Sequence, residues 1–235
     1  MKILYRIYSL LIATPLFLVV TILVASTIIV TAFLGDSKFL AYWLPHFWSR
    51  FTCFIYLIRV KVEGREHIGK RQSYVFLANH QGWFDIFLIY GYLNHNFKWM
   101  MKEYLKKLPF VGYACYKSKH VFVGDSLSSI QKTVEQARKT LRSGMSLVIF
   151  PEGTRTYDGK LQPFKRGAFM LANEIGLPIV PMTITGSYEV MNRHHKLPKF
   201  GKLHLQIHPA IPQEAHKGKP TKVFMQEVYD IINTH

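Results

Sequence analysis

Short apolar runs alternate with amphipathic stretches over the part of the chain that follows residue 60. An apolar run of about 4–8 residues predicts a buried strand, whereas apolar residues three and four positions apart predict one face of a helix. On this basis strands are expected at Tyr74–Ala78, Leu147–Phe150, Ile179–Ile184 and Leu203–Ile207. Helices are expected at Trp83–Leu93, Leu127–Leu141, Arg166–Ile175 and Thr221–Ile232. Alternating strands and helices predict an α/β fold, with a mixed sheet flanked by helices.

A long uncharged stretch lies near the start of the chain. No charged side chain occurs from Ser9 to Leu34, and about 26 residues in a helix can cross a bilayer with some tilt. Lys2 and Arg6 precede the stretch, as they would in a signal peptide. However, the apolar run is too long for a signal peptide and no clear cleavage site follows it, so we expect the segment to be retained.

A second hydrophobic segment, Phe39–Val60, is rich in aromatic residues and is interrupted by Arg50 and Arg59. Tryptophan and tyrosine favour the membrane interface. The two segments could form a helical hairpin within one leaflet, or one span followed by a surface helix. The alternative is that both are core helices of a soluble fold. We expect residues 1–60 to be a membrane-anchoring helical segment and residues 61–235 to form one globular domain.

The chain is strongly basic, with a formal net charge of +16 over 235 residues. Lysine and arginine beside a membrane anchor attract anionic lipid, and the same surface would attract anionic substrates or an acidic carrier protein. No recognisable nucleic-acid-binding motif accompanies the charge. The bilayer is therefore the expected partner, and nucleic acid is not.

A polar segment with a histidine and a carboxylate follows the first predicted strand directly. His80 and Asp85 are five positions apart, which would place them on different faces of a single helix. If Gly82 makes a turn and a helix begins near Trp83, Asp85 lies in the first helical turn and can reach back to His80. A histidine oriented by a carboxylate is a general base. The alternative is a capping or core histidine beside a helix-terminal aspartate.

A second polar loop follows the second predicted strand. Gly153 permits unusual backbone torsions, Thr154 offers a hydroxyl, and Arg155 offers a planar fork of donors suited to phosphate. Lys165 and Arg166 add two cations further along. The loop is neither a Walker loop nor a dinucleotide fingerprint.

The cysteines and histidines show no metal-binding spacing. Cys53 and Cys115 fit neither a disulfide framework nor a metal site, although Cys115 as an acyl-carrying nucleophile stays a minor alternative. His204 and His208 lie on a predicted strand, where four residues span about 13 Å, too far to share one ion. We predict no metal.

Four blocks of this sequence together resemble the 1-acyl-sn-glycerol-3-phosphate acyltransferases. His80 and Asp85 match the HxxxxD block of that family, and Phe150–Thr156 matches its FPEGTR block. Lys102–Gly112 looks like the second block and Leu177–Pro181 like the fourth, in the same order. The resemblance covers most of the chain that follows the hydrophobic segments.

The resemblance implies an O-acyltransferase in which His80 and Asp85 are the catalytic pair. The substrate-binding residues that it implies are Lys102, Glu152, Gly153, Thr154 and Arg155. Of these, Lys102 and Arg155 would hold the phosphate of the acceptor, and the other three would shape the loop. No Gly-x-Ser-x-Gly elbow is present, so a serine acyl-enzyme is not expected.

The reaction so implied joins an acyl chain to the sn-2 hydroxyl of 1-acyl-glycerol-3-phosphate (lysophosphatidic acid) and yields phosphatidic acid for phospholipid synthesis. The donor would be acyl-carrier protein or acyl-CoA, as a co-substrate and without a further cofactor. The expected location is the cell inner membrane, with the catalytic domain on the cytoplasmic side.

One departure from the family pattern keeps alternatives open. Many members carry an Asp-Arg pair after the strand near residues 120–123, whereas here Val123 is followed by Gly124 and Asp125. The acceptor could then be another lysophospholipid or an aminolipid. From other classes, the chain could be a thioesterase, in which the same base activates water, or a lipid-binding protein.

Overall fold

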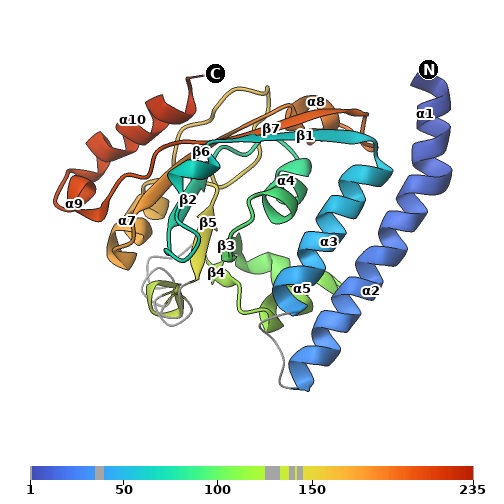
Figure 1. Ribbon diagram of the computed structural model, residues 1–235, viewed down its shortest axis with the longest axis horizontal. Helices are drawn as coiled ribbons and strands as arrows, with labels where there is room; N and C mark the ends of the chain where they lie inside the picture. Colours follow the sequence, from blue (N-terminus) through green and yellow to red (C-terminus); the bar gives the residue numbers. More distant parts are fainter. Residues whose placement is uncertain (1, 35–39, 125–132, 138–140, 142–144, 235) are drawn as a thin grey trace.

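The computed structural model describes residues 2–34, 40–124, 133–137, 141 and 145–234. Those residues form a seven-stranded sheet in the order β1-β7-β6-β2-β5-β3-β4 (Figure 1). The strands are β1 (Ile58–Glu63), β2 (Val75–Ala78), β3 (Phe97–Lys102), β4 (Val121–Val123), β5 (Ser146–Ile149), β6 (Ile179–Thr185) and β7 (Gly201–Ile207). Neighbouring strands are parallel except β6 and β7, which are antiparallel. The predicted mixed α/β sheet is thus confirmed.

The four predicted strands correspond to β2, β5, β6 and β7, with ends that differ by one or two residues. Strands β2 and β5 are buried along their whole length, which explains why they are continuous apolar runs in the sequence. Strand β1 begins at Ile58, inside the predicted segment Phe39–Val60. The helical part of that segment therefore ends earlier, at Ile55.

Helices cover both faces of the sheet. Phe76 and Ala78 of β2 belong to the core that packs under α3 (Leu40–Ile55) and α4 (Phe84–Tyr92). Val75 and Leu77 alternate with them and belong to the core under α7 (Arg166–Ile175) and α10 (Thr221–Ile232). The central strand thus separates two apolar layers, as a strand that is buried on both faces must.

Most of the predicted helices are present. Trp83–Leu93, Arg166–Ile175 and Thr221–Ile232 correspond to α4, α7 and α10. Of the predicted helix Leu127–Leu141, residues 133–137 are helical and most of the remainder lies outside the described residues. Three shorter helices are α5 (Val111–Lys117), α8 (Ser187–Met191) and α9 (Gln213–His216).

The N-terminal residues form a long helix that lies against the globular part (Figure 1). It consists of α1 (Lys2–Tyr8), a π-helical stretch (Ser9–Ala13) and α2 (Thr14–Phe33). Helix α3 runs antiparallel beside it, and the indole N–H of Trp48 donates to the hydroxyl of Thr21 at 2.8 Å.

The outer face of this long helix is apolar and exposed. Its exposed side chains include Leu4, Leu11, Leu18, Val19, Leu23 and Phe33. Within the described residues, Ile3–Phe33 is the one helix long and apolar enough to span a membrane. An apolar face of this size favours contact with lipid over water.

Candidate active site

His80 and Asp85 meet at the carboxyl end of β2. The Nδ1 atom of His80 lies 2.7 Å from Oδ2 of Asp85. The Asp85 carboxylate is fully buried and can only accept a hydrogen bond when ionised, so the proton of the neutral imidazole is on Nδ1. Nε2 of His80 therefore carries the lone pair that a general base needs, and His80 lines the cavity described below.

The chain turns between the two residues as expected, but Gly82 is needed there for its close approach to α8 and not for a positive φ. Backbone N–H groups of Gln81 and Gly82 donate to the same Asp85 oxygen at 2.7 and 2.9 Å. A Cβ on Gly82 would lie 2.6 Å from the carbonyl oxygen of Met191, so a larger residue would push this turn away from the end of α8. Asp85 thus orients the histidine ring and also fixes the backbone beside it.

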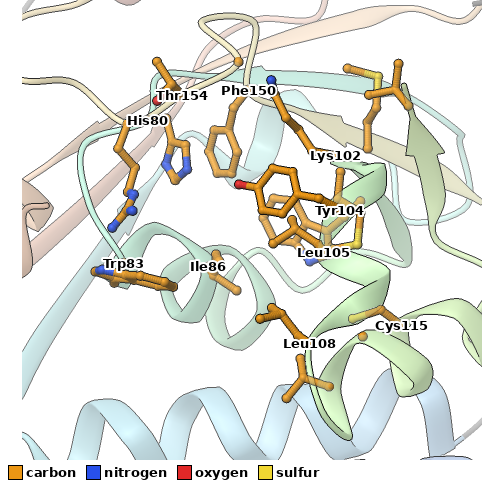
Figure 2. Close-up of a pocket in the computed structure, with 18 of the residues that line it drawn as sticks. His80, Trp83, Ile86, Lys102, Tyr104, Leu105, Leu108, Cys115, Phe150 and Thr154 are labelled. Carbon is orange, nitrogen blue, oxygen red and sulfur yellow. The ribbon is translucent and has the colours of Figure 1, made fainter. Parts of the chain in front are cut away.

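An aromatic stack supports the His80 ring from one side. The ring lies parallel to that of Phe150, with centroids 3.9 Å apart, and Phe150 stacks in turn on Trp99 at 5.4 Å. Figure 2 shows the imidazole beside the Phe150 ring. Packing of the imidazole on Phe150, which Trp99 supports from behind, limits the orientation of the ring and so preorganises it for proton transfer.

Glu152 is buried and connects the two polar loops through hydrogen bonds. Its side chain does not line the cavity. Its carboxylate accepts from the backbone N–H of His80 at 2.6 Å and from that of Gln162 at 2.8 Å. Burial raises the pKa of Glu152 to about 7, against the lowering effect of these two hydrogen bonds. The contacts of Glu152 are structural, and its prediction as a substrate-binding residue stays a prediction.

The loop after β5 presents Arg155 to the cavity. Its guanidinium lies over the indole of Trp83, 4.2 Å from the ring centroid, and its Nη1 atom is buried and lacks a hydrogen-bond acceptor among the described residues. Burial lowers the pKa of Arg155, and the nearby charge of Arg193 lowers it further by a smaller amount. Gly153 has a φ of 70°, a backbone conformation that glycine adopts without strain.

Of the cations predicted from the sequence, some line the cavity and one does not. Lys102 at the end of β3 and Lys165 before α7 line the same cavity as Arg155, whereas Arg166 is exposed and does not. The Lys165 side chain lies against Gly153, 3.0 Å from the position of a Cβ there. Arg193 was not predicted from the sequence, yet it lines the cavity and its Nη2 donates to the Thr154 hydroxyl at 3.0 Å.

A cavity of about 920 Å³ connects these residues with an apolar interior. Figure 2 shows His80 and Thr154 towards the upper end, Ile86 and Leu105 in the middle, and Leu108 and Cys115 towards the lower end. Phe17 and Thr21 of α2 and Trp48 of α3 complete the wall. The site is thus polar and cationic at one end and apolar along the rest of its length.

Cys115 is a poor nucleophile in this position. Burial raises the pKa of its thiol to about 12, and the nearby Lys98 only partly offsets this. Among the described residues, no group of three or more His, Cys, Asp or Glu side chains could hold a metal ion. His204 contacts Glu63 at 2.6 Å, while His208 contacts Thr183 at 2.8 Å.

Comparison with known proteins agrees with this geometry. Residues 59–185 match the protein family described as Acyltransferase. A 1-acyl-sn-glycerol-3-phosphate acyltransferase of Chlamydomonas reinhardtii is 30% identical over 210 residues, which are 87% of this chain and 61% of that protein. The enzyme of the same name from Saccharomyces cerevisiae is 32% identical over 66% of this chain and 52% of its own. The chain thus spans little more than half the length of the curated relatives that it matches.

A solved structure shares the whole fold. The 1-acyl-sn-glycerophosphate (LPA) acyltransferase PlsC from Thermotoga maritima superposes with a TM-score of 0.81 and 25% sequence identity. The match covers 99% of this chain and 93% of that protein, so it includes the N-terminal helices as well as the sheet.

Proposed function

This chain belongs to the acyltransferase family, and from that premise we propose that it transfers an acyl chain from a thioester to lysophosphatidic acid. The product is phosphatidic acid. One observation carries the proposal: the base His80 lies in the same cavity as a cluster of cations and a long apolar wall. Relatives that carry the name 1-acyl-sn-glycerol-3-phosphate acyltransferase support the choice of acceptor.

The chemistry requires one proton to move twice. Nε2 of His80 accepts the proton of the acceptor hydroxyl as that oxygen attacks the thioester carbonyl. The new C–O ester bond forms, the C–S bond breaks, and the imidazolium returns the proton to the leaving thiolate. Asp85, at 2.7 Å from Nδ1, stabilises the imidazolium. Such general base catalysis contributes about 10²–10⁴-fold, and the positioning of both substrates in the cavity supplies the rest.

The two ends of the cavity suit the two parts of the substrates. Arg155 and Lys102 would bind the phosphate of the acceptor, because a guanidinium fork matches phosphate oxygens. The apolar wall that extends to Phe17 and Trp48 would hold an acyl chain. The volume of the whole cavity, about 920 Å³, lies in the range of ligand pockets, about 300–1,000 Å³.

The donor and the location complete the proposal. Acyl-carrier protein and acyl-CoA are both acidic donors that a chain of net charge +16 would attract, and no cofactor is needed because the thioester is already activated. The exposed apolar face of the N-terminal helix would hold the protein on the inner membrane, with the catalytic domain on the cytoplasmic side.

Acyl transfer by purified, detergent-solubilised protein tests the proposal. A labelled acyl thioester is offered with lysophosphatidic acid, with another lysolipid, or with no acceptor. Label in phosphatidic acid with the first acceptor alone is the expected result. Label on a different lysolipid would reassign the phosphate end of the site, and free fatty acid without acceptor would identify a thioesterase.

A further inference from the structure

Arg193 is held in the cavity wall by two side-chain contacts and by a fixed backbone beside it. Its Nη2 donates to the hydroxyl of Thr154 at 3.0 Å, and its guanidinium carbon lies 3.7 Å from the ring centroid of Tyr157. The preceding residue, Asn192, is buried and binds the backbone on both sides, at the Tyr188 carbonyl and the His194 N–H. The side chain is therefore fixed rather than free in solvent.

The segment that carries Arg193 is tied to the turn that carries the base. The backbone N–H of Trp83 donates to the carbonyl of Met191 at 3.2 Å, and Gly82 packs against that same carbonyl. The segments that carry Arg193 and His80 are thus joined by direct backbone contact. A ligand group held by Arg193 would be positioned relative to His80.

Arg193 and Arg155 are neighbouring like charges, and the negative charge of Asp85 only partly offsets the effects of burial and of Arg193 on Arg155. Arg193 lowers the pKa of Arg155 after the larger effect of burial. In the part of the chain that the structure describes, neither guanidinium forms a salt bridge. Nη1 of Arg155 and Nε of Arg193 are buried donors with no acceptor there. Buried unpaired donors and adjacent cations are costly unless an anion binds between them.

We propose that Arg193 binds the phosphate of the acceptor lipid together with Arg155, so that two guanidinium groups hold the headgroup. A phosphate monoester carries about −1.5 to −2 charges at pH 7 and three acceptor oxygens, which matches two cations with donors to spare. The inference rests on the proposed function. Phosphate groups also occur on CoA and on the carrier-protein arm, so the test must separate acceptor from donor.

The test compares Arg193→Gln and Arg193→Lys with wild type on two acceptors, lysophosphatidic acid and monoacylglycerol, which lacks the phosphate. For Arg193→Gln we expect KM for lysophosphatidic acid to rise about tenfold or more, with Arg193→Lys intermediate. The rate with monoacylglycerol and the donor KM should not change. Arg155→Ala should give the same pattern. Arg71→Gln, at an exposed position outside the cavity, is the matched control and should leave all values unchanged.

Three outcomes would overturn the inference. An equal loss on both acceptors would mean that Arg193 only holds the loop, and Thr154→Val, which removes its hydroxyl partner, would then reproduce that loss. A raised KM for the donor alone would move the phosphate to the donor. An unchanged KM for lysophosphatidic acid would remove Arg193 from the site.

A binding measurement keeps the inference separate from the proposed function. Wild-type protein without transfer to lysophosphatidic acid would refute the function. In that case, the rise in melting temperature on addition of lysophosphatidic acid still tests whether Arg193 binds the lipid. The rise should be present in wild type and in Arg71→Gln and lost in Arg193→Gln, and an equal rise in all three would refute the inference.

Discussion

At the scale of single residues, the site depends on contacts that fix a histidine in one state. Asp85 accepts one hydrogen bond from the imidazole and two from the backbone, while Phe150 covers one face of the ring. The hydrogen bond to Asp85 fixes the tautomer of His80, and the two backbone hydrogen bonds fix the turn beside it. The stacking on Phe150 fixes the tilt of the ring. The imidazole therefore needs no reorganisation before it accepts a proton.

Asp85→Asn tests the charge of this pair at constant side-chain size. We expect kcat to fall by about 10²–10⁴-fold, because the imidazolium is no longer stabilised, while KM for the acceptor changes little. Initial rates over a range of acceptor concentrations measure both. His80→Ala should abolish turnover, and the double variant should be no worse than His80→Ala because the two residues act as a unit. Asp85→Asn with wild-type kcat would contradict the assignment.

Cys115 gives the opposite expectation. Because burial raises the pKa of its thiol to about 12, the thiolate is almost absent at neutral pH and cannot carry the acyl group. Cys115→Ala should keep kcat within a few-fold of wild type in the same transfer assay, with His80→Ala as the inactive reference. A loss comparable to that of His80→Ala would restore the cysteine mechanism.

The site residues that could be predicted from the sequence are those that directly follow a strand. His80 and Asp85 were predicted to meet, and they do. Arg193 could not be found in this way, because it lies 39 positions from its partner Thr154 in a loop with no motif. The role of Glu152 beneath the loops was equally hidden, since a sequence does not show whether a motif carboxylate points to a ligand or to backbone N–H groups.

At the scale of elements, two loops at the carboxyl ends of β2 and β5 act as one unit. Glu152 joins them through the N–H groups of His80 and Gln162, and the N–H of Thr156 donates to the carbonyl of His80 at 2.8 Å. Strand ends that are adjacent in a parallel sheet bring their loops together. The loop that carries His80 and the loop that carries Arg155 are therefore held together by direct hydrogen bonds.

Glu152→Gln should reveal this connection through pH. Burial raises the pKa of Glu152 from its ordinary value of 4.5 to about 7 in the folded protein. The folded state therefore binds a proton that the unfolded state has lost between these pH values, and wild type loses stability as pH rises through that window. The neutral variant lacks this penalty, which is on the order of 3 kcal/mol above pH 7.

Thermal unfolding of wild type and Glu152→Gln at pH 5, 6, 7 and 8 measures the effect. The melting temperature of the variant should rise relative to that of wild type across the series and level off above pH 7. A constant offset is also expected, because the amide places a donor against one backbone N–H. A difference that is independent of pH would show that Glu152 is not buried as a charge.

Element prediction succeeded where burial determines the residue pattern, but it missed β3, an interior strand that is only partly buried, and β1 at one edge of the sheet. Strands β2 and β5 are almost entirely apolar because both faces are covered, and β6 is buried in the same way although Thr183 interrupts its apolar run. Strand β1 was assigned to the hydrophobic segment that precedes it, since its alternation of buried and exposed residues, Ile58 to Glu63, follows a helix with no polar break. Nothing local distinguishes such an edge strand from the end of an amphipathic helix.

At the scale of the whole molecule, two features favour the same partner, a lipid bilayer. They are the exposed apolar face of the long N-terminal helix and the net positive charge of the chain. Leu11 of the π-helical stretch and Leu23 of α2 are 67% and 60% exposed, and burying such side chains in the membrane would contribute about 1.5–3 kcal/mol each. Association would therefore depend on the long helix as a unit.

The double variant Leu11→Glu/Leu23→Glu should weaken binding to vesicles that contain anionic lipid by at least about 10²-fold, because two charges replace apolar contacts with lipid. Flotation with vesicles measures the bound fraction. Val223→Glu, at a position 50% exposed on α10, introduces the same side chain away from the long helix and should bind like wild type. Equal binding by all three proteins would exclude this face as the anchor.

The inner face of the long helix has a further consequence. Phe17 and Thr21 line the cavity from a helix that also carries exposed apolar side chains, so this one helix would separate an acyl chain in the cavity from lipid outside. A fatty chain could then pass sideways between bilayer and enzyme without crossing water. Turnover would follow the surface mole fraction of lysolipid rather than its bulk concentration, and diluting the substrate with inert lipid would slow the enzyme even at constant total amount.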